Sequence, residues 1–168
     1  LSIQVHPDDA YAKAHENGSL GKTECWFILD CKENATLVVG HNAKTKEELE
    51  QMIHEGRWKE FIREIPIKPG DFIQIDPGTV HAIKGGTLLL ETQQSSDITY
   101  RVYDYDRLSN GKPRQLHIVQ SIDVITVPAK SADNSVVHIE KKDDAIQQLI
   151  QCPYYTVYRI DVEHRVET

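Results

Sequence analysis

Polar residues of the kind that bind metal ions alternate with apolar residues at the start of the chain. Ser2, Gln4 and His6 are each separated by one apolar residue, and Pro7 follows directly. Residues two apart in an extended strand project from the same face. Proline lacks a backbone N–H group and favours the end of a strand. We therefore expect the three polar side chains to point together from the end of a short strand.

Two later segments contain further residues with suitable chemistry. Lys22 and Glu24 repeat the two-residue spacing at the start of a run rich in aromatic and branched residues, which favours a strand. His81 follows a Pro77-Gly78 turn and could face the interior of a barrel at its mouth. Imidazole, carboxylate and amide groups together would form a mixed nitrogen and oxygen metal site. Spacing leaves zinc, manganese, iron and nickel open, and it also leaves open a purely structural role for each residue.

The hydrophobic pattern predicts many short strands interrupted by turns. The expected strands are residues 1–6, 23–30, 36–40, 72–75, 79–83, 87–93, 98–105 and 154–162. Helical spacing predicts short helices at residues 8–16, 45–53, 58–62, 116–125 and 143–150, the first capped by Asp8 or Asp9 and the second by a Thr45–Glu48 capping box. This order favours a sandwich or small barrel with a helical insertion between strands.

The composition excludes some classes of function. The formal net charge of −7 argues against general nucleic-acid binding, which needs clustered Lys and Arg, although a small anion needs only one or two cations. No apolar run is long enough to cross a membrane, and no signal-peptide pattern opens the sequence. Three scattered cysteines without CxxC spacing indicate reduced thiols, so we expect a cytoplasmic protein.

Four stretches of the chain resemble a known enzyme family. The stretches are SIQVHPDD, GKTECWF, KPGDFIQIDPGTVHAI and SDITYRVYDYDR. In this order they are similar to type I mannose-6-phosphate isomerases of the short bacterial kind, members of the cupin superfamily, and the resemblance covers most of residues 1–125. It implies a mainly β fold, a cupin-type β-barrel (a double-stranded β-helix, or jelly roll), with a helical insertion at about residues 45–63.

The resemblance also implies roles for particular residues. The zinc ligands of the family correspond to Gln4, His6, Glu24 and His81, so a single Zn²⁺ ion per chain is expected. Lys22 and Arg101 correspond to active-site cations. Ser2 falls where the family places a residue that lines the substrate site. Glu91 and Asp97 match acidic positions near the catalytic arginine, and Arg101 without the resemblance would be an ordinary solvated strand residue.

The activity that the resemblance implies is the interconversion of mannose 6-phosphate and fructose 6-phosphate, with a phosphorylated hexose as the binding partner. The reaction passes through an enediolate, whose formation the metal would favour by polarising the sugar oxygens, and Arg101 would supply a fixed cation for the enediolate or the phosphate. Lys22 would hold the phosphate or act as a base. Opening of the sugar ring needs a proton carrier, for which Asp97, Glu91 and a metal-bound water are unranked candidates.

Two other functions are compatible with the same residues. One is a sugar-binding or regulatory cupin module without turnover. The other is a different cupin enzyme, such as an iron-dependent oxygenase, because His6, Glu24 and His81 also make a set of two histidines and a carboxylate. Gln4 and the nearby cations favour the isomerase.

The expected organisation is a catalytic cupin core at residues 1–125, followed at residues 126–168 by a connecting segment and the truncated start of a second β domain. The oligomeric state, the pathway and the activity of this chain on its own are left open.

Overall fold

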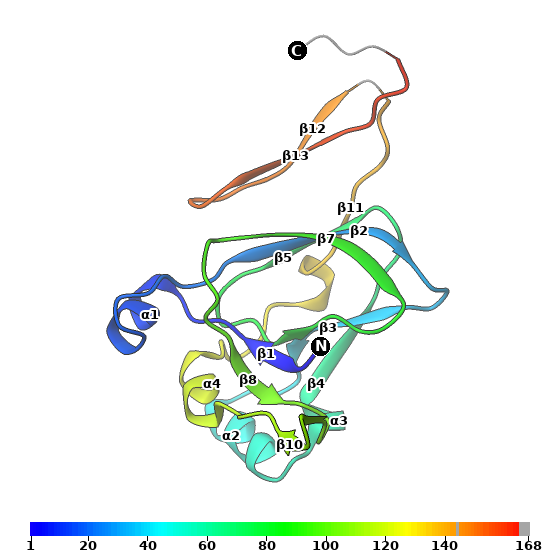
Figure 1. Cartoon of the computed structure of the whole chain (residues 1–168). Helices are drawn as coiled ribbons and strands as arrows, with labels where there is room; N and C mark the ends of the chain where they lie inside the picture. The colour runs from blue at the N-terminus through cyan, green and yellow to red at the C-terminus, as the bar shows by residue number, and fades with distance from the viewer. Residues whose placement is uncertain (144, 165–168) are drawn as a thin grey trace.

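Two antiparallel sheets form the body of the structure, a computed structural model that describes residues 1–143 and 145–164 (Figure 1). The first sheet contains, in spatial order, β4 (Ile62–Pro66), β3 (Thr36–His41), β6 (His81–Ala82), β1 (Ile3–Val5) and β8 (Tyr100–Tyr103). The second contains β11 (Val137–His138), β5 (Asp71–Ile75), β2 (Glu24–Cys31) and β7 (Thr87–Gln93). The predicted mainly β architecture is confirmed, with two sheets rather than one closed barrel.

Apolar residues from both sheets pack against one another in a shared core. This inner cluster consists of Trp26, Ile28, Ile73 and Ile75 from the second sheet, with Leu37, Val39, Ile65 and Ile67 from the first sheet and the segment that follows β4. Removing this apolar surface from water is the main force that holds the sheets face to face. The strands alternate, so the residues between these apolar ones point out of the cluster.

Helices cover the outer face of the first sheet. The predicted insertion is present as α2 (Lys46–His54) and α3 (Trp58–Phe61), and α4 (Ile118–Val124) packs beside them (Figure 1). Thr45 caps α2, because its hydroxyl accepts a hydrogen bond from the backbone N–H of Glu48 at 3.2 Å. Residues of these helices share a second buried cluster with β1, β3, β6 and β8. The first sheet is therefore buried on both faces.

The remaining short elements connect these layers. They are α1 (Asp9–His15), capped by the Asp8 carboxylate, the β9 (Leu108–Ser109) and β10 (Lys112–Pro113) pair, and a 3₁₀ turn at Ala132–Asn134. No helix in the described part of the chain is long and apolar enough to cross a membrane.

The prediction of a helix at residues 143–150 is wrong. The segment contains β12 (Ile146–Gln151), which pairs with β13 (Thr156–Ile160) as a separate hairpin at the C-terminal end of the chain (Figure 1). A bulge between Gln148 and Ile150 breaks the alternation of the strand, and the irregular spacing resembles a helical one. Residue 144 within this prediction, and residues 165–168 of the predicted connecting segment, lie outside the described residues.

A second correction concerns Ile62, which was predicted in a helix. The one-turn helix α3 ends at Phe61, and Ile62 begins β4, the edge strand of the first sheet. Polar residues interrupt the apolar pattern of β4 because an edge strand is partly exposed to solvent. This strand was therefore not expected from the sequence.

We predict that Phe61→Ala lowers the free energy of unfolding by about 3–5 kcal/mol, because Phe61 is fully buried and the substitution leaves a cavity. The Phe61 ring stacks on His41 of β3 at 5.5 Å and is therefore one of the contacts that attach the insertion to the sheet. Urea titration would measure the change. Val119→Ala, at a position 72% exposed on α4, is the control and should shift the value by less than about 0.5 kcal/mol. Equal effects of the two substitutions would contradict the proposed anchoring of the insertion.

Candidate metal centre

Three adjacent strands of the first sheet place polar side chains in one row. Gln4 in β1 lies opposite His81 in β6 on one side and Arg101 in β8 on the other. Directly opposite residues of an antiparallel pair project to the same face. Ile3 and Val5, on either side of Gln4, point into the cluster beneath the helices. The row of polar residues therefore faces the second sheet.

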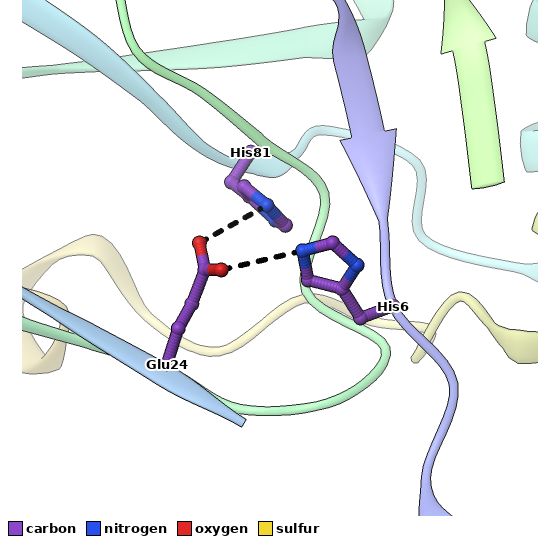
Figure 2. Close-up of side chains that lie close together, drawn as sticks. All are labelled: His6, Glu24 and His81. Atoms are coloured by element: carbon purple, nitrogen blue, oxygen red, sulfur yellow. Dashed lines mark ion pairs between the residues drawn. The ribbon is translucent and has the colours of Figure 1, made fainter. Parts of the chain in front are cut away.

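His6, Glu24 and His81 converge between the two sheets (Figure 2). Glu24 Oε2 lies 3.4 Å from His6 Nε2, and Glu24 Oε1 lies 3.4 Å from His81 Nε2. All three side chains are 1% exposed. Ligand atoms bound tetrahedrally to a metal at 2.0–2.2 Å would be about 3.3–3.6 Å apart. The two histidine–glutamate separations fall in this range, and the ligand atoms all lie within 4.8 Å of one another, so the three side chains could hold a metal ion.

Backbone carbonyls orient both imidazoles. His6 Nδ1 lies 2.9 Å from the carbonyl oxygen of Ile98, and His81 Nδ1 lies 2.8 Å from that of Thr79. A carbonyl can only accept, so each Nδ1 carries a proton, and each Nε2 is the ring atom available to a metal ion. Hydrogen bonds of this kind fix metal-binding histidines in the correct tautomer.

The charge state of the site suits a cation. Burial raises the pKa of Glu24, but the neighbouring His6 and His81 imidazoles and the Lys22 ammonium outweigh it and lower the pKa to about 2. Burial and the neighbouring His6 lower the pKa of His81 to about 4. Glu24 is thus ionised and His81 neutral near pH 7. His6 Nε2 and both Glu24 oxygens are buried without a hydrogen-bond partner among the described residues, as expected of atoms that face a metal.

Gln4 and Ser2 lie beside the trio. Gln4 Nε2 is 3.2 Å from His81 Nε2, and the Ser2 hydroxyl lies 3.5 Å from Gln4 Oε1. The oxygen and nitrogen of an amide have nearly the same shape, so a half-turn of the Gln4 amide would direct its oxygen to the position of a fourth ligand. The four predicted ligands and Ser2 therefore lie in one site.

A tight loop positions Lys22 over Glu24. Lys22 Nζ lies 3.3 Å from Glu24 Oε2, and the residue is only 8% exposed. The N–H of Gly21 donates to Asp9 Oδ1 at 2.8 Å. A Cβ atom at Gly21 would lie 2.3 Å from the carbonyl carbon of Asp8, so only glycine fits this close approach. The lysine is thus held beside the candidate metal ligands.

Arg101 lies next to Gln4 in the polar row. Its Nη1 donates to the carbonyl of Gln115 at 2.8 Å, and its backbone N–H donates to His117 Nδ1 at 3.1 Å. Arg101 Nε is buried without a hydrogen-bond partner among the described residues. Burial and the nearby Arg114 lower the pKa of Arg101, which stays protonated. A fixed cation with a free donor therefore lies next to Gln4.

The two predicted acidic residues lie in different surroundings. Glu91 is exposed, and its Oε2 accepts a hydrogen bond from the Trp26 indole at 3.1 Å. Asp97 is exposed directly before Ile98, whose carbonyl orients His6. Among the described residues, no hydrogen bond or ion pair connects either carboxylate to the histidine–glutamate trio.

The sequence interpretation missed the residues that support the ligands. Trp26 lies edge-on to His81, with ring centroids 5.6 Å apart, and also bonds Glu91. The sequence does contain a signal for Trp26: it lies two residues after Glu24 in a strand, so the two side chains project from the same face. The carbonyls of Thr79 and Ile98 left no signal in side-chain type.

Comparisons with known proteins connect the chain to one group of enzymes. No protein-family model matches the chain. The chain is 54% identical over 158 residues to the mannose-6-phosphate isomerase ManA of Bacillus subtilis, and 49% identical over 168 residues to the mannose-6-phosphate isomerase of Streptococcus mutans. The resemblance to mannose-6-phosphate isomerases is confirmed.

These matches include 94% and 99% of the chain but 50% and 52% of the two relatives. The chain therefore spans about half the length of the mannose-6-phosphate isomerases that it matches.

Solved structures support the fold. The crystal structure of the mannose 6-phosphate isomerase from Bacillus subtilis matches with a TM-score of 0.80 and 49% identity, over 94% of the chain and 50% of that protein. A mutant of phosphomannose isomerase from Salmonella typhimurium matches with a TM-score of 0.67 at 15% identity, over 84% of the chain and 55% of that protein, which shows the fold alone. The predicted cupin-type class is thereby confirmed.

We predict that the chain binds one divalent cation and that His81→Ala weakens binding at least about 100-fold, because loss of a ligand opens a buried site to water. Dialysis against zinc followed by elemental analysis would measure stoichiometry and affinity. His54→Ala, at an exposed position in the last turn of α2, is the matched control. Equal metal retention in both variants would refute the assignment of His81.

The metal-free protein should lose stability as the pH falls from about 6.5 toward 4. The pKa of His81 is lowered from 6.5 to about 4 in the folded state, so between these values the unfolded chain binds more protons. This contribution is fully present above pH 6.5 and is lost as the pH falls through the folded pKa, at a cost on the order of 3 kcal/mol at most. Thermal unfolding across this range would measure it.

His81→Gln should make the stability of the metal-free protein depend less on pH between about 6.5 and 4, whereas His54→Gln should leave this pH dependence unchanged. Part of the slope should remain in His81→Gln, because burial also lowers the pKa values of His41 and His117. If the stability of His81→Gln changed with pH as steeply as that of the original protein, His81 would take up its proton equally in the folded and the unfolded state.

Proposed function

We propose that this chain carries the metal-dependent catalytic core of an isomerase that interconverts mannose 6-phosphate and fructose 6-phosphate. The observation that carries the proposal is the buried His6–Glu24–His81 group, with partnerless atoms directed at one point, in a chain 49–54% identical to mannose-6-phosphate isomerases. The substrate would be a phosphorylated hexose. The three free cysteines fit the proposed cytoplasmic location.

Zinc is the proposed metal, held by His6, Glu24, His81 and Gln4. Two imidazole nitrogens lie 3.4 Å from the oxygens of one carboxylate, and the Gln4 amide group lies 3.2 Å from His81 Nε2, which supports this choice. Bound zinc would supply Lewis-acid polarisation of the sugar oxygens. The proximity of Gln4 to His81 favours four protein ligands over the two-histidine, one-carboxylate set of an iron oxygenase.

Arg101 would stabilise negative charge that develops on the substrate. Isomerisation removes a proton next to a carbonyl and creates an enediolate, so a cation with a donor aimed at its oxygens lowers the barrier. Arg101 keeps its charge at all relevant pH values, and its Nε has no partner among the described residues. Lys22, close to Glu24 and almost buried, would bind an anionic oxygen of the substrate, with Ser2 beside it.

Glu91 is the preferred candidate for proton transfer, and Asp97 is the second. Glu91 lies opposite Trp26 in the β2–β7 ladder, so its side chain shares the inward face with Glu24. It is also exposed enough to meet a substrate. Asp97 is exposed beside the segment that orients His6, which supports a place at the rim.

The domain organisation is also a proposal. Residues 1–125 would form the catalytic core, and residues 126–168 would connect it to a second β domain. The separate two-stranded sheet of β12 and β13 supports this division.

A coupled assay for fructose 6-phosphate formation from mannose 6-phosphate tests the function. It would use the complete gene product that contains residues 1–168, metal-stripped and then zinc-restored. We expect zinc-dependent turnover, lowered about 100-fold or more in Arg101→Ala because an oxyanion-stabilising group is removed. Val119→Ala serves as the control at an exposed position. Absence of turnover from the zinc-loaded protein would refute the isomerase and leave a sugar-binding module.

A further inference from the structure

Trp26 touches both the candidate metal centre and a candidate acid–base group. Trp26 is 1% exposed. Glu24 lies two residues earlier in β2, so both side chains project from the inward face of this strand. The edge of its ring system meets His81, with centroids 5.6 Å apart and planes at 69°. Its indole N–H donates to Glu91 Oε2 at 3.1 Å. One side chain thus connects a metal ligand to Glu91.

The hydrogen bond follows from the strand register and from burial. Trp26 and Glu91 are direct partners in the antiparallel β2–β7 ladder, which brings their side chains together on one face. A buried indole N–H needs an acceptor, since leaving it unpaired costs about 1–3 kcal/mol. In the described part of the chain, this hydrogen bond is the only one that Glu91 makes through its side chain. Without it, the exposed carboxylate would be free to rotate.

We propose that Trp26 is a positioning residue that holds the Glu91 carboxylate at the rim of the metal centre for proton transfer. The bond engages Oε2 and leaves Oε1 available to the substrate. The indole itself is 1% exposed, so it would act on the reaction through Glu91. This inference rests on the proposed isomerase function.

Trp26→Phe is the informative substitution. Phenylalanine keeps an aromatic ring against His81 but has no N–H group, so metal binding should be retained while Glu91 is released. We expect unchanged zinc stoichiometry, a decrease in kcat of about tenfold and a KM within about twofold, because an acid–base group that is poorly placed loses part of its contribution of about 10²–10⁴. Loss of zinc from Trp26→Phe would overturn the inference and indicate that Trp26 supports His81 instead.

A double-mutant cycle separates positioning from simple loss of packing. Glu91→Gln should lower kcat about 100-fold, and adding Trp26→Phe to it should cause little further decrease, because the group on which Trp26 acts is already inactive. Fully multiplicative effects would show that Trp26 acts by another route and would overturn the inference. Trp58→Phe is the matched control, because Trp58 is stacked on Tyr103 at 4.5 Å in the helical layer and should leave kcat unchanged.

Nuclear magnetic resonance of the indole N–H groups tests the contact without activity. The chain has two tryptophans, so Trp58→Phe assigns the two signals. In Glu91→Ala the Trp26 N–H should shift upfield and exchange at least about tenfold faster with solvent, whereas an unchanged signal would overturn the proposed contact. If the wild-type protein has no isomerase activity, the proposed function fails, and these spectra still decide whether Trp26 holds Glu91.

Discussion

The buried Glu24 carboxylate is the constraint on which the arrangement of this protein depends. A negative charge with almost no access to water is costly unless positive or hydrogen-bonding groups surround it. Here Lys22 supplies a positive charge 3.3 Å from one of its oxygens, and His6 and His81, each 3.4 Å from an oxygen, could share a metal ion with it. These groups belong to separate segments, so the charge ties them together only when both sheets are formed. A bound metal ion would complete this compensation, because the same oxygens lack hydrogen-bond donors among the described residues.

The two-sheet fold meets this constraint through strand register. The β6–β1–β8 ladder aligns His81, Gln4 and Arg101 across one sheet, and β2 presents Glu24 from the other. The apolar residues between these polar ones enter two separate cores, one between the sheets and one beneath the helices. Helices on the outer face therefore allow both faces of the first sheet to be buried, which keeps the polar row rigid. Rigid placement is what a metal site with little tolerance for misplacement requires.

Around this centre, the groups with proposed catalytic roles differ in how many contacts hold them. Lys22 is fixed by a glycine-dependent loop and an ion pair, and Arg101 by the carbonyl of Gln115 and by its backbone bond to His117. Glu91 depends on a single hydrogen bond to Trp26. This difference between the cations and Glu91 suits the proposed chemistry, since fixed cations stabilise developing charge without reorganisation. A group that transfers protons to a moving substrate benefits from one anchored and one free oxygen.

Local pattern alone determined much of the fold. The alternation at residues 1–6, the Thr45 cap and the turn-bounded strands predicted the elements, because side-chain period and capping depend on neighbours in sequence. The ligand types were also visible in the sequence, although the choice of Gln4, His6, Glu24 and His81 came from family resemblance. The tertiary structure decided the rest. Only strand pairing brings residues 6, 24 and 81 within ligand distance, and only a long-range hairpin makes residues 146–151 a strand rather than the predicted helix. The carbonyls that orient the histidines, and the Trp26 contact with Glu91, likewise arise from residues far apart in the chain, whose proximity no local period encodes.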